Sequence, residues 1–255
     1  MPKGFIYVLS TVTSQYEQRH FCNVPTEFDG RLYFGPCKIT MRPRMRPGDF
    51  VFGMSGSNTS PRRIVFVAEI EERLTFAEAY NRFPDLRGPY GPIHVRPLEI
   101  ERSKPFPRSS YKSIPGSIHA DNWEYDLASR ELDAFFVCSE PESCVGHWLG
   151  AAGPEIGGEI LTFLKKCSVH GLNTPPGAKN KHATSSKPVV YRGPKGGELT
   201  VGLHAETDEP EVLLELCNQL LSPEERLLDH RLVRECEDNR TSGCRLAPPR
   251  KARCP

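Results

Sequence analysis

A basic segment in the first quarter of the chain carries the side chains best suited to binding an anion. Arg42, Arg44 and Arg46 alternate along it, which would place three guanidinium groups on one face of an extended strand. Arg and Lys bind phosphate oxygens with salt-dependent, largely sequence-independent affinity. The same charges would also keep an exposed sheet edge from pairing with another chain. The predicted phosphate-binding residues are Lys38, Arg42, Arg44, Arg46 and Arg62.

A small polar loop, residues 53–60, follows the strand after the basic segment. Glycine lets the backbone approach a ligand closely, and hydroxyl and amide groups can contact a base edge or a phosphate. No Gly-Lys-Ser/Thr follows, so the loop is not a Walker motif. A polar hairpin turn is the alternative interpretation. The predicted ligand-binding residues here are Ser55, Gly56, Ser57 and Asn58.

An aromatic pair next to polar residues is the third candidate. Asn122, Trp123 and Tyr125 would supply a stacking surface and a polar edge, which is what recognition of an unstacked base requires. Packing of both rings into the core at a loop entry is the alternative. We include all three residues in the predicted ligand site.

Evidence for catalysis or a metal centre is weaker. Two Cys-x-x-His pairs could supply four zinc ligands, but zinc sites usually pair Cys with Cys at this spacing, so buried thiols are favoured. A thiol activated by the lysine beside it is another minor alternative. Signatures of serine hydrolases, zinc proteases and zinc deaminases are absent from the sequence. We therefore expect no cofactor and favour a non-enzymatic role. The weak metal candidates are Cys144, His147, Cys167 and His170, and the thiol is Cys37, beside Lys38.

An ordered set of short motifs over residues 1–140 resembles the nucleotide-modification-associated domain family of bacteria and phages, specifically its second type. The motifs are Cys37-Lys38, Arg42, Gly48-Asp49, Gly53-Met54-Ser55-Gly56-Ser57, Leu74-Thr75-Phe76-Ala77-Glu78-Ala79-Tyr80 and Asp121-Asn122. The resemblance implies a link to DNA modification and to restriction or phage defence. The strand–Gly-Asp–strand order also looks like the barrel of the PUA, ASCH, EVE and YTH superfamily, whose members bind RNA or modified bases.

Charge is distributed unevenly along the 255 residues. Residues 1–120 hold 17 Lys and Arg against 11 Asp and Glu, net +6, whereas residues 121–235 hold 11 against 19, net −8. A basic front half suits an anionic partner. The chain has no apolar run of the roughly 20 residues that a membrane span needs, and it opens on a strand pattern rather than a signal peptide. We therefore expect a cytoplasmic protein without a membrane partner, whose nine cysteines are mostly reduced.

Hydrophobic patterns and turn residues predict the elements that must position these groups. Strands are expected at residues 5–10, 31–34, 50–54, 62–70, 93–100, 132–138 and 199–204. Helices are expected at residues 75–82, 155–167, 208–221 and 222–234. The predicted class is α+β, with a twisted PUA-like β-barrel core, peripheral helices and a helical C-terminal third. The predicted units are a core at 1–140, a helical and loop extension at 141–235 with an exposed loop at 173–197, and a disordered tail at 236–255.

Three functional classes follow from these features. The leading hypothesis is a protein that recognises nucleic acid, a modified base or a nucleotide and is linked to DNA modification or phage defence. An enzyme that makes or removes a nucleotide modification is the first alternative. A protein-interaction subunit of a modification or defence complex, acting through the acidic helices at 208–234, is the second.

Overall fold

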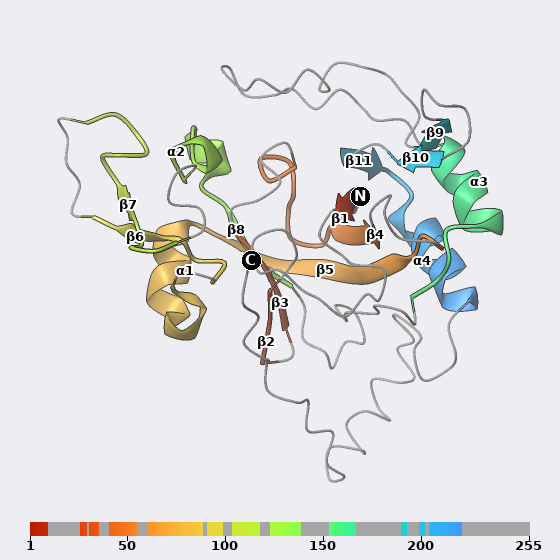
Figure 1. Ribbon diagram of the computed structural model, residues 1–255, viewed down its shortest axis with the longest axis horizontal. Coiled ribbons are helices and arrows are strands. Elements are labelled where there is room, and N and C mark those ends of the chain that lie inside the picture. The colour runs from red at the N-terminus through yellow and green to blue at the C-terminus, as the bar shows by residue number, and fades with distance from the viewer. Residues whose placement is uncertain are drawn as a thin grey trace, which may run out of the picture.

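The computed structural model places a mixed β-sheet at the centre of the protein (Figure 1). It describes residues 1–9, 26–29, 31–35, 41–55, 61–88, 91–98, 104–117, 123–138, 153–166, 190–192, 199–201 and 204–220. The seven strands lie in the order β11-β1-β4-β5-β8-β3-β2. They are β1 (Gly4–Leu9), β2 (Thr26–Phe28), β3 (Arg31–Phe34), β4 (Phe50–Ser55), β5 (Ile64–Leu74), β8 (Phe135–Cys138) and β11 (His204–Thr207).

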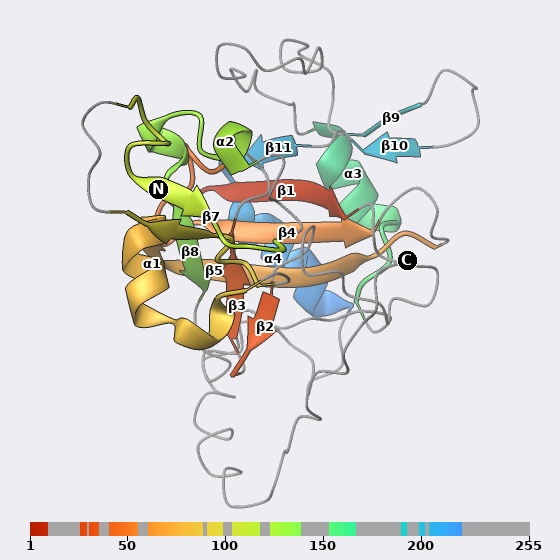
Figure 2. The ribbon, with the colours of Figure 1, turned by 60° about the vertical axis from the view of Figure 1, so that its left-hand side comes forward.

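Short helices and two hairpins surround this sheet. The helices are α1 (Phe76–Arg82), α2 (Trp123–Asp126), α3 (Gly158–Lys166) and α4 (Pro210–Gln219), with 3-10 turns η1 (Pro84–Leu86) and η2 (Arg130–Leu132). The hairpins pair β6 (Val95–Pro97) with β7 (Tyr111–Ser113), and β9 (Val190–Arg192) with β10 (Leu199–Val201). Figure 2 shows α1 and α3 at opposite ends of the long strands, with α4 behind them.

The central strands are apolar on both faces because both faces are covered. Successive residues alternate between two packed layers, so Val51 joins the cluster around Phe5 while Phe52 joins the cluster formed with α3 and α4. This explains why β4 and β5 read as nearly continuous apolar runs in the sequence rather than as alternating ones. A third cluster joins α1 to β8 and the β6–β7 hairpin, with Phe76 at its centre.

The capping box predicted at the start of α1 is confirmed. The Thr75 hydroxyl accepts a hydrogen bond from the Glu78 backbone N–H at 3.2 Å, and the Glu78 carboxylate accepts one from the Thr75 N–H at 2.7 Å. These two bonds satisfy backbone groups that the first turn of a helix leaves unpaired. Local residue spacing is therefore sufficient to place this helix.

The predicted class is confirmed as a sheet-rich α+β fold with few helices. A closed barrel is not found among the described strands, since β11 and β2 stand at the two ends of the order and do not pair. The sheet also crosses the predicted boundary at residue 140, because β11 pairs antiparallel with β1, with Thr207 opposite Gly4.

Several predicted elements differ in the structure. The strand expected at 199–204 is two strands, since β10 pairs with β9 whereas β11, which begins at His204, pairs with β1. The strand expected at 93–100 is limited to β6 among the described residues. The helix expected at 155–167 begins only at Gly158, because the Ile156 N–H donates to the Arg62 carbonyl and the preceding residues pair with the start of β5. The loop expected at 173–197 contains β9 near its end. Helix 208–221 is confirmed as α4, whereas helix 222–234 and the tail 236–255 lie outside the described residues.

Candidate functional site

The basic segment does not form the extended strand that its alternating arginines suggested. Residues 41–44 form a turn, in which the N–H groups of Arg44 and Met45 donate to the Met41 carbonyl at 2.8 and 3.1 Å. The expectation that three guanidinium groups share one face is therefore wrong. We call residues 41–48, which lead into β4, the basic arm.

Arg42 is a structural residue of the basic arm. Its side chain is 1% exposed and packs beside the Phe76 ring, with 6.0 Å between the guanidinium carbon and the ring centroid. One guanidinium nitrogen donates to the Leu132 carbonyl at 2.8 Å, and the other donates to the Asp126 carbonyl. Arg42 thus ties the arm to α2 and η2, and its guanidinium is directed at the protein's own backbone rather than at solvent.

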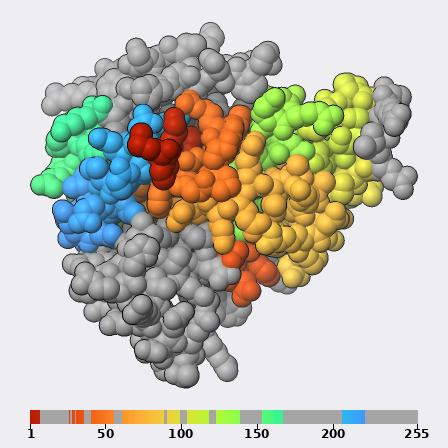
Figure 3. Space-filling view, turned by 180° about the vertical axis from the view of Figure 1, so that it is seen from behind, coloured from red at the N-terminus to blue at the C-terminus, as the bar shows by residue number. Residues whose placement is uncertain are grey.

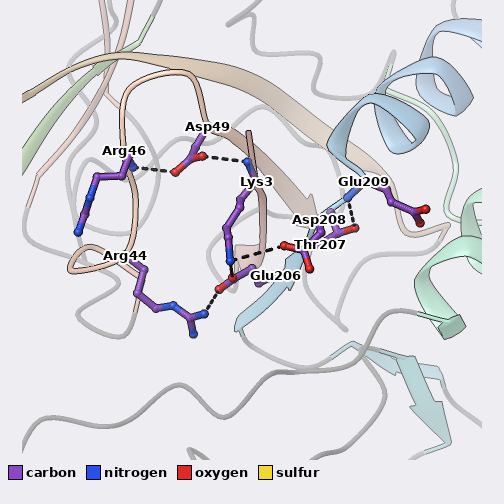
Figure 4. Close-up of polar contacts among 8 residues, drawn as sticks. All are labelled: Lys3, Arg44, Arg46, Asp49, Glu206, Thr207, Asp208 and Glu209. Carbon is purple, nitrogen blue, oxygen red and sulfur yellow. Dashed lines mark hydrogen bonds and ion pairs between the residues drawn. The ribbon is translucent and has the colours of Figure 1, made fainter. Parts of the chain in front are cut away.

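Arg44 forms part of an ion-pair cluster with the N-terminus and β11 (Figure 4). The Glu206 carboxylate is 3% exposed and lies 2.6 Å from Lys3 Nζ and 2.5 Å from an Arg44 guanidinium nitrogen. Asp208 lies 3.5 Å from the same Lys3 nitrogen. The hydrogen bond to Glu206 is the main cause of a raised pKa for Lys3. Two cations therefore face two carboxylates, and this cluster carries little net charge toward a ligand.

The Asp49 carboxylate joins the N-terminal residues to the basic arm through two hydrogen bonds from backbone N–H groups. It accepts from the Lys3 N–H at 2.9 Å and from the Arg46 N–H at 2.7 Å. The preceding Gly48 has φ of 86°, a left-handed conformation that favours glycine. In Figure 3 the red N-terminal residues lie between the orange surface of the arm and β4 and the blue surface of β11 and α4. The Gly-Asp pair therefore has a structural role here.

Arg46 is the solvent-facing cation of the basic arm. One of its guanidinium nitrogens donates to the Pro43 and Met45 carbonyls, each at 2.8 Å, and it forms no ion pair with a residue in the described part of the chain. The pKa of the nearby Arg73 is lowered, first by burial and then by the positive charge of Arg46. Arg46 and Arg73 are thus close enough for their charges to interact beside η2, where the Asp133 and Glu131 carboxylates offset part of the charge of Arg73 and Arg73 donates to the Glu131 carbonyl at 3.0 Å.

The predicted loop begins at the opposite end of β4 from the arm. Ser55, the last residue of β4, is fully buried, and its hydroxyl accepts from the Arg63 N–H at 2.9 Å. A six-residue strand separates the two ends by ~17 Å. Arg62 lies at the loop end, away from the arm, just before β5. Gly56, Ser57 and Asn58 lie outside the described residues.

The aromatic candidates lie on the arm side of the sheet. Trp123 is half-buried against the third core cluster, whereas Tyr125 is 42% exposed on α2. Arg42 links this helix to the arm through the Asp126 carbonyl. The structure therefore brings Arg42, Trp123 and Tyr125 into one region and separates them from Ser55.

The remaining sequence candidates fall outside the part of the chain that the structure describes. Those residues are Lys38, Cys37, Asn122, Cys144, His147, Cys167 and His170. Among the described residues, no group of three or more His, Cys, Asp or Glu side chains is arranged to hold a metal ion. No described helix has the length and apolar character needed to cross a membrane.

A hydrogen-bonded pair beside α1, formed by the half-buried Asp133 carboxylate and the buried Tyr111 hydroxyl, was not foreseen from the sequence. Asp133 accepts from the Phe76 N–H at 2.8 Å and from the Tyr111 hydroxyl at 2.7 Å, and that hydroxyl accepts from the Ala77 N–H at 3.3 Å. Burial is the main cause of raised pKa values for both Asp133 and Tyr111. The pair caps the first turn of α1 from 57 residues away for Asp133 and 34 for Tyr111, and no local motif signals such contacts.

Replacing Tyr111 by phenylalanine should destabilise the protein more at pH 7 than at pH 4. Because the pKa of Asp133 is raised, the folded state binds its proton more tightly, and stability falls as pH rises from about 4. The Tyr111 hydroxyl donates to the ionised carboxylate of Asp133 and stabilises it. Removing the hydroxyl therefore makes the free energy of unfolding fall more steeply as the pH rises. We expect a cost of about 1–3 kcal/mol at pH 7, measured by urea unfolding at both pH values. Tyr80→Phe on α1 is the control, and equal costs at the two pH values would contradict the proposed role.

Comparison of the whole chain with protein-family models, with curated proteins and with solved structures finds no match.

Proposed function

We propose that this protein recognises nucleic acid and reads a modified base or nucleotide within it, in a cytoplasmic system of DNA modification or phage defence. The proposal combines the resemblance to nucleotide-modification-associated domains with the residues gathered on the arm side of the sheet. On the same resemblance we propose that the sheet belongs to a PUA-like core.

The observation that carries the proposal is the environment of Arg46. This exposed guanidinium contacts neutral carbonyls and lies near Arg73, and it forms no ion pair with a described residue. A phosphate there would gain attraction from Arg46 and Arg73 and displace no ion pair. Arg44, in contrast, would have to leave Glu206 first.

The spacing of the predicted parts favours a polymer over a free nucleotide. The arm and the end of β4 at which the predicted polar loop leaves the strand are ~17 Å apart, which corresponds to about five nucleotides of a stacked strand. Tyr125 lies on the helix that Arg42 holds against the arm, and its half-exposed ring offers a surface for base stacking. In this proposal Arg46 contacts phosphate and Tyr125 stacks on a base.

Changing Arg46 to alanine tests this proposal. Binding of labelled single-stranded and duplex DNA and RNA, with and without modified cytosine or adenine, is measured by fluorescence anisotropy across salt concentrations. We expect the variant to bind more weakly and the slope of log K against log salt to fall by about 0.7 to 0.9, the value for one lost phosphate contact. Lys165→Ala, an exposed cation on α3, is the matched control.

Three results would count against the proposal. They are no binding by the wild-type protein to any nucleic acid, an unchanged slope in Arg46→Ala, or an equal change in the Lys165 control. Turnover of a nucleotide by the purified wild-type protein, detected by mass spectrometry, would favour the enzymatic alternative instead.

A further inference from the structure

The β6–β7 hairpin places two cations directly opposite each other on its outer face. In the antiparallel register Arg96 is opposite Lys112, and both side chains are exposed. The neighbouring residues Val95 and Tyr111 point to the other face and are buried in the core cluster around Phe76. The inner face thus anchors the hairpin, while the outer face of the paired residues carries only positive charge.

This arrangement places two like charges side by side in the free protein. The Cβ atoms of directly opposite residues lie about 5 Å apart, and like charges at such positions destabilise strand pairing. Beyond the backbone pairing of the two strands, neither the Arg96 nor the Lys112 side chain has an ion pair or hydrogen bond within the described residues. The Glu124 carboxylate on α2 is bound by Arg108 through two contacts of 2.8 and 2.7 Å. An anion seated between Arg96 and Lys112 would convert this repulsion into attraction.

We infer that the outer face of the β6–β7 hairpin is a second phosphate-binding surface, which extends the nucleic-acid interface proposed above and rests on that proposal. The contacts between Arg108 and Glu124 join the segment that leads into β7 to α2, the helix that carries the half-exposed Tyr125. A phosphate polymer with stackable bases uses both features at once, whereas an acidic peptide uses only the charge. The occupant is therefore a nucleic-acid strand that passes along the hairpin toward α2.

The test compares two double variants of the full-length protein. Arg96→Ser with Lys112→Ser removes the outer-face charges, and Lys165→Ser with Lys166→Ser removes the same charge from exposed positions on α3. A fluorescein-labelled single-stranded 20-mer is titrated across salt concentrations. We expect the hairpin variant to lose affinity on the order of tenfold, with the salt slope reduced by about 1.4 for two lost contacts. The α3 variant should retain both the affinity and the slope.

Each other outcome overturns the inference in a recognisable way. If the wild type binds and the two variants behave alike, the hairpin surface is rejected while the proposed function stands. If the wild type binds no nucleic acid, the proposed function fails and this surface with it. Self-association of the hairpin variant with unchanged binding would assign the cations to protection of the strand edges. Equally tight, equally sensitive binding of polyglutamate would replace the nucleic acid by an acidic protein surface.

Discussion

Arg42→Ala is expected to lower the free energy of unfolding by about 4 kcal/mol, because the change leaves two buried carbonyls unpaired and opens a cavity beside Phe76. Arg42 is 1% exposed, and its donors serve Leu132 and Asp126. Urea denaturation followed by circular dichroism measures the loss. A cost of this size is a large fraction of the 5–15 kcal/mol that stabilises a typical domain.

Arg46→Ala is the matched control, since it removes the same side chain four residues away from an exposed position. We expect that variant to change the free energy of unfolding by less than about 0.5 kcal/mol. Equal effects of the two variants would contradict the burial of Arg42. The contrast also decides how binding is tested, because loss of binding in Arg42→Ala would report unfolding rather than a lost phosphate contact.

Gly53→Ala is expected to destabilise the protein by about 3 kcal/mol through overpacking. A Cβ atom built at Gly53 would lie 1.9 Å from a carbon of the Phe66 ring, which is fully buried on the neighbouring strand. The ring cannot move into solvent, so β4, β5 or the ring must shift within the core. Thermal and urea denaturation of the purified variant give the cost.

The Phe66→Leu variant tests whether the contact with the Phe66 ring is the cause of the lost stability. Leucine removes the ring atoms that the new methyl group would contact, so the double variant Gly53→Ala with Phe66→Leu should lose clearly less stability than the sum of the single changes. Additive losses would show that the clash with Phe66 is not the cause.

Local patterns were sufficient for the elements that depend on neighbouring residues. The Thr75–Glu78 capping box fixes the start of α1, and the apolar stripe at 213–220 correctly predicts α4. The apolar runs at β4 and β5 are also found where expected, with β5 extending four residues beyond the predicted end at 70. In each case the conformation is favoured by side chains a few residues apart.

The burial and ion pairing of the candidate site residues depend on contacts with residues far away in the chain, which no local pattern contains. Arg42 looked like its neighbours Arg44 and Arg46, yet its hydrogen-bond partners are 84 and 90 residues away and bury it. Lys3 and Arg44 are neutralised by Glu206, which is 203 residues from Lys3. Identical residue types in one short segment thereby acquire different roles.

The sequence by itself determined the α+β class, most of the central strands, the helices α1 and α4, and a concentration of positive charge in the first half of the chain. Only the tertiary structure decided which of those charges faces solvent and which is buried or paired with a distant carboxylate. The physical reason is that short-range spacing sets backbone conformation, whereas burial and ion pairing depend on which distant strands are brought together. β11 is the clearest case, because its pairing with β1 carries Glu206 to the basic arm.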